Sequence, residues 1–229
     1  MMTTRMFLLT GLLLSSGPLM AAAPPAPAAR IVHVAGDVTI GSNTGGRLAK
    51  KGAVLAADDS VTTAAGAVAV IELPDGSRLK LRESSRFAVT LPGANSTVTE
   101  VFLSFGSVFA KVTKRLAGQH FRMRTPSAVA AVRGTEFFTA YGRANGKSRD
   151  LWVCVNEGSV ELETTKSKQS LLVPAGKGVL IKAGLDLTKP QAYNWTKSLN
   201  WNMDDDKGGV EDKTNLDGAY ADLLDQDYR

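Results

Sequence analysis

The side chains of this chain that could do chemistry are few, and their spacing indicates no catalytic site. His33 and His120 are far apart, with no spaced Asp, Glu or Cys around them, so neither a metal cluster nor a nucleophile and base pair is indicated. Ser77-Arg78-Leu79-Lys80 has the letters of a Ser-x-x-Lys motif, but it follows an Asp-Gly turn and alternates like a strand, whereas that motif needs a helix. No phosphate-binding glycine loop occurs. We therefore expect no enzyme activity, no metal and no cofactor.

Cys154 is the only cysteine, so disulfides cannot staple the fold and stability must come from a packed core. It lies within the strand-forming run Leu151-Trp152-Val153-Cys154-Val155. This context predicts a buried, inert thiol.

A cationic strand face is the first candidate for binding. In the run from His120 to Thr125 the basic residues alternate with apolar ones, and three more cations precede it, so the candidate residues are Lys111, Lys114, Arg115, His120, Arg122 and Arg124. The favoured interpretation is a solvated face whose charges keep a strand edge from aggregating. The alternative is a site for envelope polyanions such as peptidoglycan or lipopolysaccharide. Nucleic acid is a poor candidate, because export would separate the protein from it and no reader motif occurs.

Charge is distributed unevenly along the chain. The formal net charge is +5, but residues 204–229 hold nine acidic and three basic side chains, which leaves −6 on this tail and +11 on the rest. A basic body with an acidic tail favours contact with polyanions but does not specify a fold. If the tail shields the basic face, its deletion should strengthen polyanion binding.

The most distinctive segment runs from Thr125 to Phe137. Thr125-Pro126 should end a strand, and Gly134 should permit a bend before Phe137 enters the core, with Thr135 between them. Arg133 is unusual among these small apolar residues. We expect its guanidinium to bind backbone carbonyls or a carboxylate, with direct ligand contact as the alternative.

Short strands separated by glycine turns dominate the middle of the chain. Turns are expected around Gly36, Gly76, Gly106, Gly158 and Gly176, since glycine adopts positive φ without steric cost. Asp75-Gly76 is the clearest hairpin, with period-two alternation on both sides. The unequal spacing of these turns argues against a regular solenoid, so the fold class is mainly β, either an irregular β-solenoid-like body or a sandwich.

These motifs together resemble the FecR domain family, over about Ile31 to Ala183. The most specific element is Thr125-Pro126 followed by Arg133-Gly134-Thr135-x-Phe137, and it is joined by Thr62-Thr63, Asp75-Gly76-Ser77, Leu79, Leu81, Leu103, Gly106-Ser107-Val108, Glu157-Gly158-Ser159-Val160 and Ala175-Gly176. The resemblance implies a periplasmic domain that relays the state of an outer-membrane transporter to a sigma factor by protein contacts. The family's anti-sigma segment and membrane helix are not recognised here, so control of a sigma factor by this chain itself is not expected.

The flanking segments predict the compartment and the tail. Residues 1–22 have the layout of a cleaved signal peptide, 23–30 form an Ala/Pro linker, 31–183 form the β domain and 184–229 a helical, acidic tail. No other segment is apolar enough to span a bilayer. A periplasmic or secreted location follows.

Two helices are expected in the tail. Ala192, Trp195, Leu199 and Met203 fall at helical spacing after a cap at Thr188. A second helix should present Leu216, Ala219, Tyr220, Leu223 and Leu224 on one face. We hypothesise that Leu216, Tyr220 and Leu223 contact an envelope protein, which makes the chain a protein-interaction or signalling module.

Overall fold

The computed structural model describes residues 28–42, 45–56, 59–93, 96–114, 118–142, 149–182 and 187–225. The predicted leader, its cleavage site, most of the linker and Arg115 lie outside these residues, as does the side chain of Leu223. The first strand begins at Ala29, two residues before the predicted start of the β domain.

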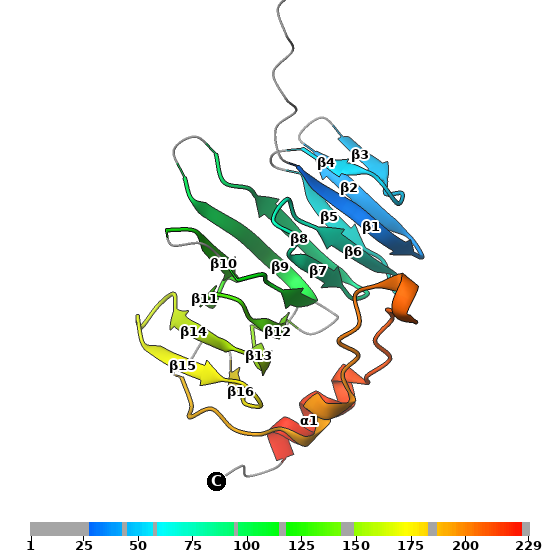
Figure 1. Cartoon of the computed structure of the whole chain (residues 1–229). Coiled ribbons are helices and arrows are strands. Elements are labelled where there is room, and N and C mark those ends of the chain that lie inside the picture. Colours follow the sequence, from blue (N-terminus) through cyan, green and yellow to red (C-terminus); the bar gives the residue numbers. More distant parts are fainter. Residues whose placement is uncertain are drawn as a thin grey trace, which may run out of the picture.

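Sixteen strands form one continuous open sheet that is folded into two layers (Figure 1). In spatial order, layer A contains β16 (Gly178–Ile181), β13 (Leu151–Glu157), β12 (Glu136–Tyr141), β9 (Val98–Lys111), β7 (Arg78–Leu81), β6 (Val68–Glu72), β1 (Ala29–Ala35) and β4 (Val54–Leu55). Layer B contains β15 (Ser170–Pro174), β14 (Ser159–Thr164), β11 (Ala128–Val132), β10 (His120–Arg124), β9 again, β8 (Ser85–Thr90), β5 (Ser60–Thr63), β2 (Val38–Ser42) and β3 (Gly45–Leu48).

The long strand β9 joins the two layers. Its first half pairs with β8 and β10 in layer B, and its second half, from Gly106, pairs with β7 and β12 in layer A. Gly106 has a φ of +90°, and a Cβ there would lie 2.2 Å from Oγ of Ser85. Gly106 is therefore a bend inside a strand, whereas the sequence had predicted a turn between strands.

The order of the strands combines both architectures that the sequence left open. The chain alternates between the layers while advancing from the β3 and β4 end to the β15 and β16 end, as an irregular solenoid does. Neighbouring strands in the described chain are antiparallel except for β9 and β10, and a single hydrophobic core fills the space between the layers, as in a sandwich. Phe87, Phe121 and Phe137 are fully buried in this core.

Residues 187–225, here called the strap, lie across the outer face of layer A (orange to red in Figure 1). They contain two 3₁₀ helices, η1 (Asn194–Ser198) and η2 (Asp205–Lys207), and the helix α1 (Leu216–Asp225). Within the described chain, no helix is long and apolar enough to cross a membrane. The tail thus packs on the body and encloses a second apolar cluster between itself and layer A.

The prediction of a helix from Thr188 to Met203 is wrong, whereas the second predicted helix is confirmed as α1. Only the short η1 forms in the first region, and Thr188 donates a hydrogen bond to the Leu180 carbonyl and caps no helix. The Asn200 and Asn202 side chains bond to nearby backbone groups of residues 204–211, and such local bonds compete with a helix.

Candidate interaction surfaces

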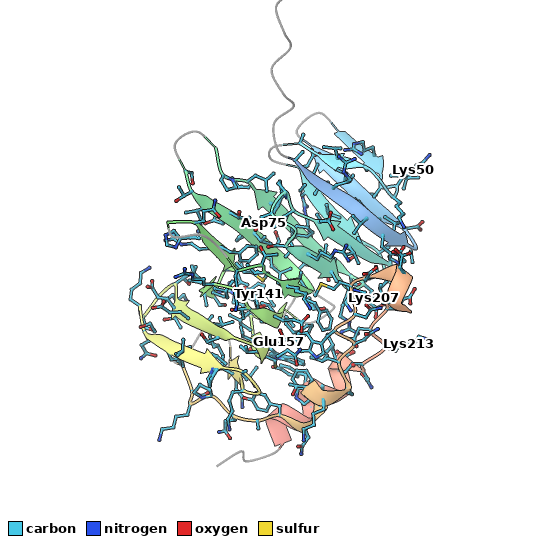
Figure 2. The ribbon with its side chains drawn as sticks, in the orientation of Figure 1. Lys50, Asp75, Tyr141, Glu157, Lys207 and Lys213 are labelled. Carbon is cyan, nitrogen blue, oxygen red and sulfur yellow. The ribbon has the colours of Figure 1, made fainter. Side chains whose placement is uncertain are left out.

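Several family motifs meet in one row of turns at one end of the body. This turn row consists of Asp75-Gly76, Thr113-Lys114, Gly134-Thr135 and Gly158-Ser159. Thr113 Oγ1 donates to the Asp75 carbonyl at 3.2 Å, and Thr135 Oγ1 donates to the Ser159 carbonyl at 2.9 Å. Turns that are far apart in the sequence therefore support one another. Figure 2 labels Asp75, on the turn before β7, and Glu157, the last residue of β13.

Close approach explains two of the three motif glycines of this row. Gly134 and Gly158 have φ values of +69° and +78°. A Cβ on Gly158 would lie 2.8 Å from the Gly134 carbonyl oxygen, and a Cβ on Gly134 would lie 2.7 Å from Cγ of Lys114. A side chain at Gly158 would push the two turns apart, and a side chain at Gly134 would displace the Lys114 side chain and strain a positive φ.

The Thr-Pro element closes the hairpin between β10 and β11. The Thr125 hydroxyl accepts hydrogen bonds from the backbone amides of Ser127 and Ala128, and the Thr125 amide donates to the Ala128 carbonyl at 2.9 Å. Thr165 Oγ1 donates to the carbonyl of Pro126, which ties this turn to the one that follows β14. Both residues thus serve a turn.

The rest of that motif divides between core and surface. Phe137 is fully buried, while the neighbouring Glu136 is buried and receives a hydrogen bond from Lys111 at 3.2 Å. Arg133 is exposed, and its guanidinium has no hydrogen bond or ion pair with any other described residue. The contact predicted for Arg133 with a carbonyl or carboxylate is therefore not found in the described chain.

The structure divides the predicted cationic face between the two layers. His120, Arg122 and Arg124 are exposed on the outside of layer B, because Phe121 and Met123 point into the core. Lys111 lies on the outside of layer A, on the same side of β9 as Phe109. The prediction that these cations form one face is wrong, because β9 passes from one layer to the other before the chain returns to β10.

Acidic side chains accompany the cations that remain on layer B. Arg124 forms an ion pair with Glu100 at 3.1 Å. Arg122 lies opposite Glu100 of β9 on one side and opposite Ala131 of β11 on the other. Ala131 lies opposite Glu161 of β14, so Arg122 has an acidic residue in a nearby strand on each side. This face has mixed charge, and it does not present the continuous positive surface that a polyanion site needs.

Three cations on the outer face of layer A hold the strap. They alternate along and just beyond β7 and are called the latch: Arg78, Lys80 and Arg82. The strap accepts their hydrogen bonds through main-chain carbonyls, chiefly those of Asn200, Asn202, Met203, Asp212 and Thr214. Carbonyl recognition suits an extended chain, because its acceptors are not used in a helix.

Lys80 is the most buried member of the latch. Its side chain has no exposed surface, and its Nζ donates to the carbonyls of Asn200 and Asn202, at 2.9 Å for the latter. The same atom lies 4.3 Å from the centroid of the Phe109 ring. Burial lowers the pKa of Lys80 to about 8.

A buried ion pair between Arg82 and Asp212 is the second contact that fixes the strap to layer A. Arg82 Nε lies 3.1 Å from Asp212 Oδ2, and both side chains are almost completely buried. The terminal nitrogen of Arg82 also donates to the Asp212 and Thr214 carbonyls at 3.1 and 2.8 Å. Burial lowers the pKa of Arg82, and the charge of Asp212 opposes that shift.

Exposed ion pairs extend the contact between the acidic strap and the basic body. Asp205 receives a hydrogen bond from Lys51 at 2.8 Å, which raises the pKa of Lys51 and lowers that of Asp205. Asp204 lies 3.7 Å from Arg78. Asp204, Asp205 and Asp212 of the tail are thus paired with cations of the body, and the described acidic residues of the tail form no ion pair with the cations of β10. The self-shielding proposed for the β10 face therefore has no support in the described residues.

Two of the three apolar residues that were expected to meet a partner, Leu216 and Tyr220, contact the body instead. Tyr220 is 6% exposed and stacks on Trp152 with ring centroids 5.1 Å apart, and Leu216 packs against the same cluster. Phe109 meets Phe138 and Trp201 at centroid distances of 4.8 and 5.2 Å. In the structure, α1 therefore uses this face within the chain.

A cavity of about 440 Å³ remains between the strap and one end of layer A. Val68, Arg82, Trp152 and Tyr220 contribute to its wall, together with residues 211–217 of the strap. Its size is in the range of small-ligand sites, but two of its charged side chains, Arg82 and Asp212, are already paired with each other. We interpret it as incomplete packing beneath the strap.

The latch was missed at the sequence level, because strand alternation indicates only that Lys80 and Arg82 lie on the face opposite Leu79 and Leu81. The alternation itself is correct, since Leu79 and Leu81 fill the core between the layers. The buried thiol of Cys154 is confirmed, and burial raises its pKa. The Ser77 to Lys80 run lies on a turn and a strand, as predicted.

Residues 59–161 match the family model described as FecR protein. The chain contains a FecR domain. The match begins later and ends earlier than the segment from Ile31 to Ala183 recognised in the sequence, so β1 to β4 and the strands from β15 onward lie outside it. All residues of the turn row lie within the matched segment of this FecR domain.

Solved structures support the fold of the domain. Two crystal structures of a putative anti-sigma factor from Parabacteroides distasonis each match with a TM-score of 0.52 and 18% identity. The alignments cover 61% of this chain and 63% or 62% of the other, so neither protein is matched over two thirds of its length. At this identity the likeness concerns the fold. No curated protein matches the chain.

Proposed function

We propose that this protein is an exported, non-enzymatic FecR-domain module that binds another protein of the cell envelope and takes part in signalling or scaffolding there. The observation that carries the proposal is the FecR match over a body whose motif residues build turns and core. Residues used in this way make a rigid scaffold and leave no constellation of acid, base and nucleophile among the described side chains.

Two separate observations support the compartment and the role. FecR domains are typical of the periplasm, and residues 1–22 have the layout of a secretory signal. The protein from Parabacteroides distasonis that shares the fold is described as an anti-sigma factor, which is compatible with a regulatory role.

Polyanion binding is the alternative that the structure favours less. Arg122 and Arg124 are interspersed with Glu100, Glu161 and Glu163 on layer B, and the cations of β7 are occupied by the strap. A partner held by packing and hydrogen bonds fits this surface better than a polyanion held by net charge.

The test is chemical cross-linking of the tagged protein in intact cells that are suspended at low or at high salt, so that the salt acts before any covalent bond forms. A protein interface resists salt more than binding through exposed charges does. We expect one discrete protein to be captured under both conditions. Capture of cell-wall or lipid material alone, lost in high salt, would overturn the proposal.

A further inference from the structure

The strap occupies its face of layer A as a bound peptide would. It pairs with the sheet edge at one described position, the bridge between Gly178 and Gln191. Elsewhere it is held by side chains that reach its carbonyls and by aromatic contacts. Recognition of main-chain carbonyls depends little on the side chains of the bound segment.

The fit between the strap and layer A is incomplete. In the described chain, five side chains have a buried polar atom without a hydrogen bond. Four of them lie where the strap meets layer A: His33, Arg82, Trp195 and Asp212. Arg82 and Asp212 are paired by charge alone at those atoms, while Trp195 Nε1 and His33 Nε2 have no hydrogen-bond partner among the described residues. Such atoms are costly to bury, so this contact is weaker than the core.

The helix that ends the strap adds little stability of its own. It has ten residues, and helices of this length are marginal in water. The cavity of about 440 Å³ under residues 211–217 removes packing at the same place. Local opening is therefore expected to begin in the strap, while the core between the layers stays closed.

We propose that the outer face of layer A is a docking surface for an extended, acidic segment of a partner protein that carries aromatic residues, and that the strap holds this surface until the segment replaces it. The chemistry of the partner is taken from the present occupant. The latch cations bind carbonyls and carboxylates, and Phe109, Phe138 and Trp152 bind aromatic rings. The inference rests on the proposed function and names the surface that performs it.

The test uses a fluorescent synthetic peptide of residues 194–217 as the probe. It is titrated into the wild-type protein and into a variant whose strap is weakened by Asp212→Asn and Tyr220→Ala, substitutions that leave the face of layer A intact. We expect the peptide to bind the weakened variant at least tenfold more tightly than the wild type. Adding Lys80→Met to that variant should reduce the binding at least tenfold.

Two results would overturn the proposed docking surface. One is equal peptide binding by all three proteins, and the other is no peptide binding by a weakened variant that keeps its β structure. If the weakened variant forms a dimer that excludes the peptide, the surface binds a second copy of this chain. That result would overturn the proposal that it binds a segment of another protein. A further measurement needs no variant: in the wild type, strap amides should exchange hydrogen at least tenfold faster than those of β12. Equal exchange rates would contradict the claim that the strap opens and can be replaced. The proposed function is tested separately, by capture of a partner in intact cells.

Discussion

At the scale of the residue, Lys80 shows how one side chain can follow the strand pattern and still occupy an unexpected environment. The alternation along β7 correctly turns Lys80 away from the central core. Its burial results from residues 200 and 202, which are 120 or more positions away in the sequence. No local pattern contains that information, so the position of the strap could not be predicted from β7.

The lowered pKa of Lys80 predicts a pH dependence of stability. The folded-state pKa of about 8 is below the ordinary value of 10.5, so between these values the unfolded chain binds more protons and stability rises with pH. Relative to Lys80→Met, the wild type should gain about 2 kcal/mol of unfolding free energy from pH 7.5 to 10. Urea unfolding followed by tryptophan fluorescence measures this, and a flat difference would show that the ammonium is well solvated.

Removing the buried carboxylate of Asp212 should lower the free energy of unfolding more than removing an exposed carboxylate does. Asp212→Asn leaves the Arg82 guanidinium buried without its counter-charge, and we expect a loss of about 3 kcal/mol. Asp206→Asn changes an exposed side chain on the same strap and should cost less than about 0.5 kcal/mol. Similar losses for both variants, in the same unfolding measurement, would mean that the Arg82 pair is not desolvated.

At the scale of the element, local signals predicted the structure correctly and long-range contacts escaped prediction. The Asp75-Gly76 hairpin and helix α1 depend on residues close in sequence, and both are found. The bend of β9 at Gly106 depends on contact with Ser85, twenty-one residues earlier. The first predicted tail helix fails because Asn200 and Asn202 bind backbone groups and present their own carbonyls to Lys80.

The bend of β9 can be tested with a matched pair of glycine substitutions. Gly106→Ala meets both a positive φ and the Ser85 side chain, so we expect a loss of about 3 kcal/mol or more. Gly66→Ala has a φ of +70° with open space around it and should cost about 1 kcal/mol. Thermal unfolding compares them, and equal costs would indicate that Ser85 moves away freely.

At the scale of the whole molecule, a basic body and an acidic tail become one unit. The charge asymmetry was visible in the sequence, and it predicted that the two parts attract. It did not identify the face, since the tail acids meet Lys51, Arg78 and Arg82 on layer A, and β10 lies in layer B. The opposite charges of the two parts were thus predicted, but the latch residues that hold the tail were not, because they depend on the path of the chain between the layers.

The central claim is that the module binds a protein and that the β10 cations play no part in this. Its most direct test is intact-cell cross-linking of the wild type beside a variant carrying Arg122→Glu and Arg124→Glu, with both cross-linked in high salt. We predict that the same discrete protein is captured by each, in equal yield, because these arginines lie on the outer face of layer B, away from the latch. Loss of capture in the charge-reversed variant, with only envelope polyanion recovered from the wild type at low salt, would contradict the claim.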